Sequence, residues 1–153
     1  MAILFKSILH NIGVVLVGIA LAYLGKMVDS ILGFPAFTST FLTGWLLLAV
    51  GFLLRVWATF YFYGHNMHVI SLQPQSALIT SGPYRFSRNP LYLGGNVFIF
   101  FGAALILGSP TALLATAIHL PLMDLFIRRE EEQLQRRFGQ EWQSYEKRVR
   151  RWL

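Results

Sequence analysis

The sequence contains no cysteine and little charge of either sign. The absence of cysteine from 153 residues excludes disulfides, thiol nucleophiles and cysteine-based metal sites. Charged residues make up only 13% of the chain and hydrophobic residues 55%, a balance outside the range of soluble globular domains. The net charge of +6 is concentrated towards the C-terminal end. Attraction of this charge to anionic lipid headgroups accounts for it better than nucleic-acid binding does.

Several sequence signatures of catalysis are also missing. There is no Gly-x-Ser-x-Gly segment, no glycine-rich phosphate loop and no His-Glu-x-x-His pattern. His65 and His68 are three positions apart, but a metal site would require a third ligand to converge on them. We therefore predict that the chain has no metal site.

Long apolar segments dominate what is present. Four of them have roughly 17–23 residues, close to the length that crosses a bilayer core. Four such segments in 153 residues leave too little polar surface to cover them in water. The sequence predicts an all-α integral membrane bundle in one domain, residues 1–153, with four transmembrane helices and a helical tail. The expected spans are 8–28, 41–63, 91–107 and 111–127, and the tail covers 128–153.

Lysine and arginine predict the orientation of the bundle. Eight of the thirteen lie in the tail from Arg128 onward, and Arg85 and Arg88 lie in the one long connection. The positive-inside rule then makes the N-terminus, the 64–90 loop and the tail cytoplasmic. Loop and tail lie on the same face under this topology, so they can meet.

The segment 81–95, SGPYRFSRNPLYLGG, is the most informative stretch of the chain. Gly82-Pro83 and Asn89-Pro90 are turn signals, and the helix that follows is expected to begin near Pro90. Two arginines and three aromatic residues are therefore held at the mouth of a helix bundle. Such a loop is suited to a charged ligand.

The tail has an amphipathic pattern. Apolar residues recur every three or four positions, which is typical of an interfacial helix, and Gly139 is expected to divide it into two pieces. These apolar positions are Leu134, Phe138, Trp142, Tyr145, Val149 and Trp152. Three glutamates precede them. Glu132 has arginine neighbours at helix-pair spacing, whereas Glu130 or Glu131 is expected to point back towards the loop and to bind something there.

Arg55 lies within or just inside the second span, where an arginine is a functional hypothesis that needs a partner. Snorkelling of its long side chain to the interface is an equal alternative. The roles of Arg55, His65 and Asp124 stay open at this point.

Two motifs occur in order, separated by a helical hairpin: GPYRFSRNPLYLG at 82–94 and EEEQLQRRFGQEWQSY at 130–145. Together they resemble the isoprenylcysteine carboxyl methyltransferase and phospholipid methyltransferase superfamily of small integral-membrane enzymes. The resemblance covers residues 73–153. One position departs from the pattern, because Asn89 stands where the family usually has histidine. An amide can form hydrogen bonds but cannot act as a general base.

The resemblance implies an S-adenosylmethionine-dependent methyltransferase, with the cofactor held between the segment 81–95 of the cofactor loop 73–95 and the part of the tail from Glu130 to Tyr145. Arginine would pair with the cofactor carboxylate, glutamate with its ammonium, and tyrosine would face the adenine or the sulfonium. Arg88 and Glu131 are the expected catalytic residues, with Glu131 as the base for an amine acceptor. The expected cofactor-binding residues are Tyr84, Arg85, Arg88, Asn89, Pro90, Tyr92, Gly94, Glu130, Glu131, Leu134 and Tyr145.

The expected acceptor is a lipid or another lipophilic, membrane-associated small molecule. Amine, carboxylate and thiol acceptors all remain open. Two alternative functions are an NADPH-dependent lipid or steroid reductase, whose membrane members resemble the same loop, and a non-enzymatic scaffold or transport protein. The acidic triplet favours the methyl donor over a dinucleotide, since carboxylates repel phosphates.

Overall fold

The computed structural model describes residues 1–37, 40–67 and 75–153. His68 and the first two residues of the expected loop 73–95 lie outside the described part. The described residues form helices and connecting turns, with no strand among them. The elements in chain order are α1 (Ala2–Leu32), α2 (Phe41–Gly64), η1 (Gly82–Arg85), α3 (Pro90–Tyr92), η2 (Leu93–Ile99), α4 (Phe100–Leu107), α5 (Pro110–Phe138) and α6 (Gln140–Arg148).

Four helical stretches in the described part are long and apolar enough to cross a membrane. They are Ala2–Leu32, Phe41–Gly64, Pro90–Leu107 and Pro110–Phe138. Each contains one of the predicted spans almost entirely, and the all-α membrane bundle is confirmed. Side chains such as Leu42, Leu53 and Leu114 are exposed on the outside of the bundle, where lipid replaces water as their solvent.

The first helix is longer than predicted. It extends beyond both ends of the expected span 8–28 and ends at Gly33, whose φ of 73° terminates the helix in a left-handed conformation. Gly25, inside this helix, lies against α5. A Cβ atom there would be 2.8 Å from both the Cβ and the backbone nitrogen of Ala112. This glycine is needed for close helix packing rather than for a turn.

The third span is one helical stretch made of three parts, and it begins at Pro90 as predicted. Its middle part, η2, is a π-helix, a wider form that is frequent at functional sites. Glycine contacts hold this span against α2. A Cβ on Gly51 would be 2.5 Å from the carbonyl oxygen of Gly94, and one on Gly44 would be 2.8 Å from that of Gly102.

A buried carboxylate fixes the end of the bundle opposite α6. Asp29 of α1 is only 1% exposed and accepts hydrogen bonds from Ser109 Oγ at 2.5 Å and from Thr111 N at 3.0 Å. Ser109 Oγ in turn accepts from Ala112 N at 3.1 Å as the N-cap of α5. A carboxylate at a helix N-terminus is also favoured by the helix dipole. Asp29 thus ties the first helix to the start of the last span.

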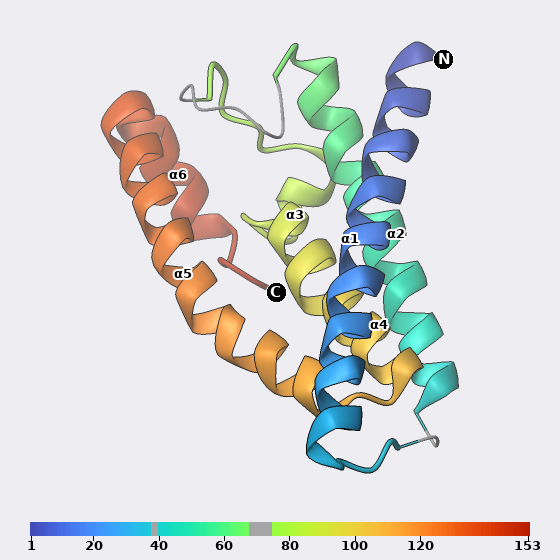
Figure 1. Cartoon of the computed structure of the whole chain (residues 1–153). Coiled ribbons are helices and arrows are strands. Elements are labelled where there is room, and N and C mark those ends of the chain that lie inside the picture. Colours follow the sequence, from blue (N-terminus) through green and yellow to red (C-terminus); the bar gives the residue numbers. More distant parts are fainter. Residues whose placement is uncertain (38–39, 68–74) are drawn as a thin grey trace.

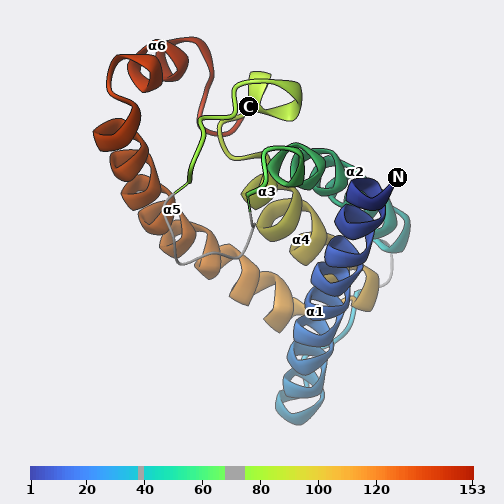
Figure 2. The same cartoon turned by 90° about the horizontal axis from the view of Figure 1, so that it is seen from above.

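The helix α5 begins beside α1 and diverges from it towards the opposite end of the molecule, as both views show (Figure 1, Figure 2). It was expected to end its span at residue 127, but the helix runs on through the three glutamates to Phe138. Gly139, with φ of 50°, then separates it from α6 as predicted. The reversal brings α6 back towards the chain segment that precedes α3 (Figure 2).

Candidate functional site

The loop before α3 and the end of the chain lie against each other. Arg88 N donates to Arg150 O at 2.9 Å, and Ser87 Oγ donates to Arg151 O at 3.2 Å. Asn89 Nδ2 donates to the same Arg151 oxygen at 3.3 Å. Loop and tail therefore meet, as the predicted topology allowed.

Glu131 is the most heavily paired carboxylate at this junction. It is 7% exposed and receives Arg151 Nη2 at 2.6 Å and Nε at 3.0 Å. Arg88 Nε lies 3.2 Å from it, and Asn89 Nδ2 donates to it at 3.4 Å. Hydrogen bonding to Glu131 raises the pKa of Arg151 above its usual value. Arg151 also reaches Asp124, 3.4 Å away, so one guanidinium spans two carboxylates of α5.

Arg88 has charge partners but unsatisfied hydrogen atoms. Its Nη1 lies 2.8 Å from Glu146 and its Nε 3.2 Å from Glu131. Neither contact has hydrogen-bond alignment, so both nitrogens are buried donors without a hydrogen-bond partner among residues 1–37, 40–67 and 75–153. The guanidinium also lies 5.5 Å from the centre of the Trp142 ring, within cation–π range. Buried donors that no protein group satisfies mark a place where a ligand can accept.

Glu130, one position before Glu131, is paired differently. Its Oε2 accepts a single hydrogen bond, 2.9 Å long, from the Tyr92 hydroxyl. None of the ion pairs among the described residues includes it. Of the two neighbouring carboxylates, Glu130 is therefore the one with capacity for a cationic ligand.

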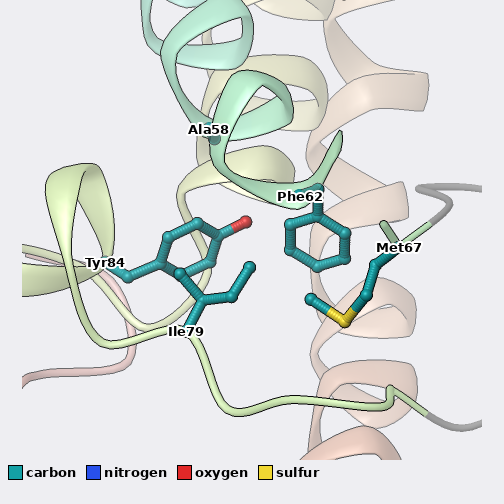
Figure 3. Close-up of a cluster of buried hydrophobic side chains, with 5 residues drawn as sticks. All are labelled: Ala58, Phe62, Met67, Ile79 and Tyr84. Atoms are coloured by element: carbon teal, nitrogen blue, oxygen red, sulfur yellow. The ribbon is translucent and has the colours of Figure 1, made fainter. Parts of the chain in front are cut away.

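Two tyrosines, Tyr84 and Tyr145, also lie at the junction of the loop and the tail. The Tyr145 hydroxyl donates to the Tyr84 carbonyl oxygen at 2.8 Å, which attaches α6 to the loop. Burial raises the pKa of both phenols above the usual value. Tyr84 packs beside Ile79 with its hydroxyl directed towards Phe62 (Figure 3), and that hydroxyl is buried without a partner.

These groups line one cavity of about 620 Å³, within the size range of small-molecule sites. It extends from the loop and tail to the diverging faces of α1 and α5. Nine of the eleven predicted cofactor-binding residues line it: Tyr84, Arg88, Asn89, Pro90, Tyr92, Glu130, Glu131, Leu134 and Tyr145.

The other two predicted residues lie elsewhere. Arg85 ends the short η1 helix with its side chain exposed and does not line the cavity. Gly94 is buried with its Cα against Arg55, where a Cβ would be 2.7 Å from Arg55 Cγ. A glycine at this position leaves room for the Arg55 side chain.

Sequence reasoning missed most of the inner half of the cavity, the part between α1 and α5, and one aromatic residue of the outer half, the part beside the loop and the tail. Trp142 was interpreted as an interfacial anchor, but it is 3% exposed and lines the cavity beside Tyr145. The apolar inner residues had no signal, because a helix in lipid is apolar all round and its cavity-facing side does not stand out. They include Gly13, Val14, Val17, Phe100 and Met123. The polar residues His10, Arg55 and Asn96 line the same half, and of these the sequence marked Arg55 as a functional hypothesis.

The remaining polar residues have local partners. His119 Nε2 lies 3.3 Å from Asn96 Oδ1, and His65 Nδ1 lies 2.8 Å from the Tyr61 carbonyl oxygen. In the part of the chain that the structure describes, no three His, Asp or Glu side chains are grouped as metal ligands would be.

Comparison with known proteins identifies the family. No curated protein and no solved structure matches the chain. The family model described as phospholipid methyltransferase matches residues 39–141, which include α2, the loop, the helical hairpin and the glutamates. This match covers more than half of the chain, and it includes most of the two motifs on which the resemblance to the superfamily rests. The chain belongs to the phospholipid methyltransferase family.

Proposed function

We propose that this protein is a membrane methyltransferase that transfers a methyl group from S-adenosylmethionine to a lipophilic acceptor. Membership of the phospholipid methyltransferase family supports the reaction class. The observation that carries the proposal further is the junction of loop and tail. It combines unsatisfied arginine donors and a glutamate without an ionic partner in one cavity.

The residues present fit the methyl donor, which carries a carboxylate, an ammonium, an adenine and a sulfonium. Arg88 would hold the carboxylate, because its Nε and Nη1 hydrogens have no aligned acceptor in the protein. Glu131 and Glu146 lie 3.2 Å and 2.8 Å from these two nitrogens and would keep the guanidinium in place. A rigidly held arginine loses little entropy when it binds an anion.

Glu130 would hold the ammonium. It is the carboxylate of the cavity with one neutral hydrogen bond, from Tyr92, whereas Glu131 is surrounded by Arg88, Asn89 and Arg151. As the base for an amine acceptor, Glu131 would first have to give up part of this pairing. In the proposed mechanism Glu131 orients Arg88, and Glu130 pairs with the ammonium of the donor.

Asn89 has a corresponding positioning role. Its amide donates to both Glu131 and the Arg151 carbonyl, and its backbone nitrogen donates to Ser87 Oγ at 3.1 Å. An amide can perform these tasks without titrating, so the departure from histidine is compatible with the proposed role.

The donor supplies an electrophilic methyl group, and the sulfur keeps the electron pair of the bond that breaks. The protein therefore needs to bring the acceptor into line with that bond and to exclude water. The ring faces of Tyr92, Trp142 and Tyr145 are suited to the adenine and to a positive sulfur. Their apolar surface would also keep the outer half of the cavity dry.

We further propose that residues 1–153 act as one domain, with the N-terminus, the loop and the tail on the cytoplasmic side. The support is the distribution of lysine and arginine and the meeting of loop and tail at one end of the bundle. Under this orientation the donor enters from the cytoplasm and the acceptor from the bilayer.

Isothermal titration of the full chain in a neutral detergent tests the proposal. We expect binding of S-adenosylmethionine and of its demethylated product, and none of NADPH. Glu130→Gln should weaken donor binding by roughly 10- to 150-fold, the loss of one charge-assisted contact of about 1.5–3 kcal/mol. Glu132→Gln is the matched control, because that side chain is 66% exposed, and it should leave the affinity unchanged. Binding of NADPH instead of the donor would favour the reductase alternative, and binding of neither would contradict enzymatic function.

A further inference from the structure

Arg55 is the one arginine buried within the membrane-spanning part of the described structure. It belongs to α2, is 8% exposed and lines the cavity together with His10 of α1. Its Nη2 lies 3.5 Å from His10 Nε2. It does not snorkel to an interface, which answers one of the alternatives left open by the sequence.

The position of Arg55 is built by several elements. Nε donates to Asn11 Oδ1 and Nη1 to the Leu91 carbonyl oxygen, both at 2.7 Å. Asn11 is itself oriented by its bond to Thr59 Oγ1 at 2.8 Å. A Cβ on Gly95 would come within 2.7 Å of Arg55 Nη1. The guanidinium is thus positioned by three helices, and Nη2 is the end that makes no short bond to any of the described residues.

The charge of Arg55 is not balanced by the protein. All seven acidic residues of the sequence lie in the described ranges, and none of the ion pairs among those ranges includes Arg55. Its two short hydrogen bonds go to neutral oxygens. An arginine buried at membrane depth without a counter-charge is costly, so an anion that enters the cavity would be strongly favoured there.

The surroundings of Arg55 define the rest of the ligand. The inner half of the cavity is lined mainly by apolar groups from three helices, among them Val14, Val17, Phe100 and Met123. It lies between α1 and α5, which diverge at this level (Figure 1). An alkyl chain fits such a lining, and the lipid-exposed sides of both helices adjoin it.

We infer that Arg55 binds an anionic group of the methyl acceptor, so that the inner half of the cavity selects amphiphiles that carry a phosphate or a carboxylate beside an alkyl chain. The inference depends on the proposed function only in identifying this ligand as the methyl acceptor. The carboxylates Glu130 and Glu131 line the outer half and Arg55 the inner half, and the same cavity therefore separates a site for a cation from a site for an anion.

Binding of single-chain probes tests the inference without the reaction. Dodecyl phosphate, dodecanoate and dodecanol share one alkyl chain and differ in the head. The full chain in neutral detergent should bind at least one of the two anions about 10-fold or more tighter than the alcohol, the effect of one charged hydrogen bond. The ratio between phosphate and carboxylate identifies which of the two heads the site prefers.

Variants then assign the preference to Arg55. Arg55→Gln should bring the anions down to the affinity of the alcohol, while binding of the alcohol itself stays within about twofold. Arg55→Lys keeps the charge and should keep a preference for the anions. Arg136→Gln removes an arginine that is 81% exposed and should leave the preference intact. A purely structural role would lower the affinity for all three probes together.

The outcomes are decisive for this inference alone. Equal binding of the anions and the alcohol by the unmodified chain overturns it, as does a preference that survives Arg55→Gln or disappears in Arg136→Gln. If Arg55→Gln does not fold, the unmodified chain and Arg55→Lys still decide. Failure of the proposed function would be seen separately, as absent binding of the methyl donor with the anion preference intact.

Discussion

Two buried carboxylates, at opposite ends of the bundle, are held in different ways. Asp29 is saturated by neutral donors of the hairpin, and no side-chain donor around it is buried without a partner. Glu131 lies among arginines beside a cavity, and Arg88 retains donors that no protein group accepts. A saturated polar cluster stabilises a fold, whereas an unsaturated one beside a cavity is suited to binding. The comparison separates structural from functional polar residues in a chain that has few of either.

The largest expected effect is on donor binding at the Glu131 end. Arg88→Gln removes the charge that would hold the donor carboxylate, and we expect the affinity to fall roughly 10- to 150-fold. Isothermal titration in neutral detergent measures this, with Arg136→Gln as the exposed control. Unchanged donor affinity in Arg88→Gln would contradict a binding role for the polar cluster around Glu131.

At the Asp29 end of the bundle we expect a loss of stability and no loss of donor affinity. Asp29→Ala leaves the Ser109 hydroxyl and the Thr111 amide without their acceptor, at a cost of about 2 kcal/mol in the free energy of unfolding. Reversible unfolding in mixed micelles measures the loss. The donor affinity of the folded fraction should equal that of the unmodified chain, and a large drop in that affinity would show that the two ends are not independent.

Arg151→Gln tests whether Arg151 holds Glu131 in position. Arg151 is 24% exposed, so its ion pairs are partly screened and are worth about 1 kcal/mol. If Arg151 keeps Glu131 in position, donor affinity should decrease about fivefold. An increase in affinity would mean instead that Arg151 competes with the donor ammonium for this carboxylate, which would contradict the assignment of the ammonium to Glu130.

The smallest effect concerns Tyr145. Tyr145→Phe removes the bond to the Tyr84 carbonyl and should cost about 1 kcal/mol of stability. Because burial raises the pKa of Tyr145 and of Tyr84, the unfolded chain loses these phenolic protons first as the pH rises. Stability is then constant below about pH 10 and falls above it. Unfolding measured from pH 8 to pH 11 should show a shallower fall in Tyr145→Phe, and an identical fall would contradict the assignment.

Much of the fold follows from composition alone. Hydropathy located four spans, Pro90 the start of the third and Gly139 the break before α6, because each depends on local chemistry. The distribution of arginine and lysine then brought the loop and the tail to one face. These predictions needed no information about packing.

The residues that sequence reasoning misplaced depend on tertiary structure. Nothing in the sequence distinguishes Arg85 from Arg88, and only the short η1 helix decides which side chain faces outward. Trp142 has the spacing of an interfacial residue, but Gly139 turns its helix inward. For Asp29 the sequence shows only an acidic residue near a turn, and its partners lie 80 or more positions away.

The contact between Gly25 and Ala112 has a consequence for the distant cavity. It lies near the start of α5, and Glu130 follows about 27 Å further along the helix at a rise of 1.5 Å per residue. The helices α1 and α5 touch at these two residues and diverge beyond them. A methyl group added at Gly25 would therefore be expected to push the helices apart and to widen their separation near Glu130. We therefore expect the width of the cavity between α1 and α5 to depend in part on these two small side chains, which lie at the opposite end of the bundle.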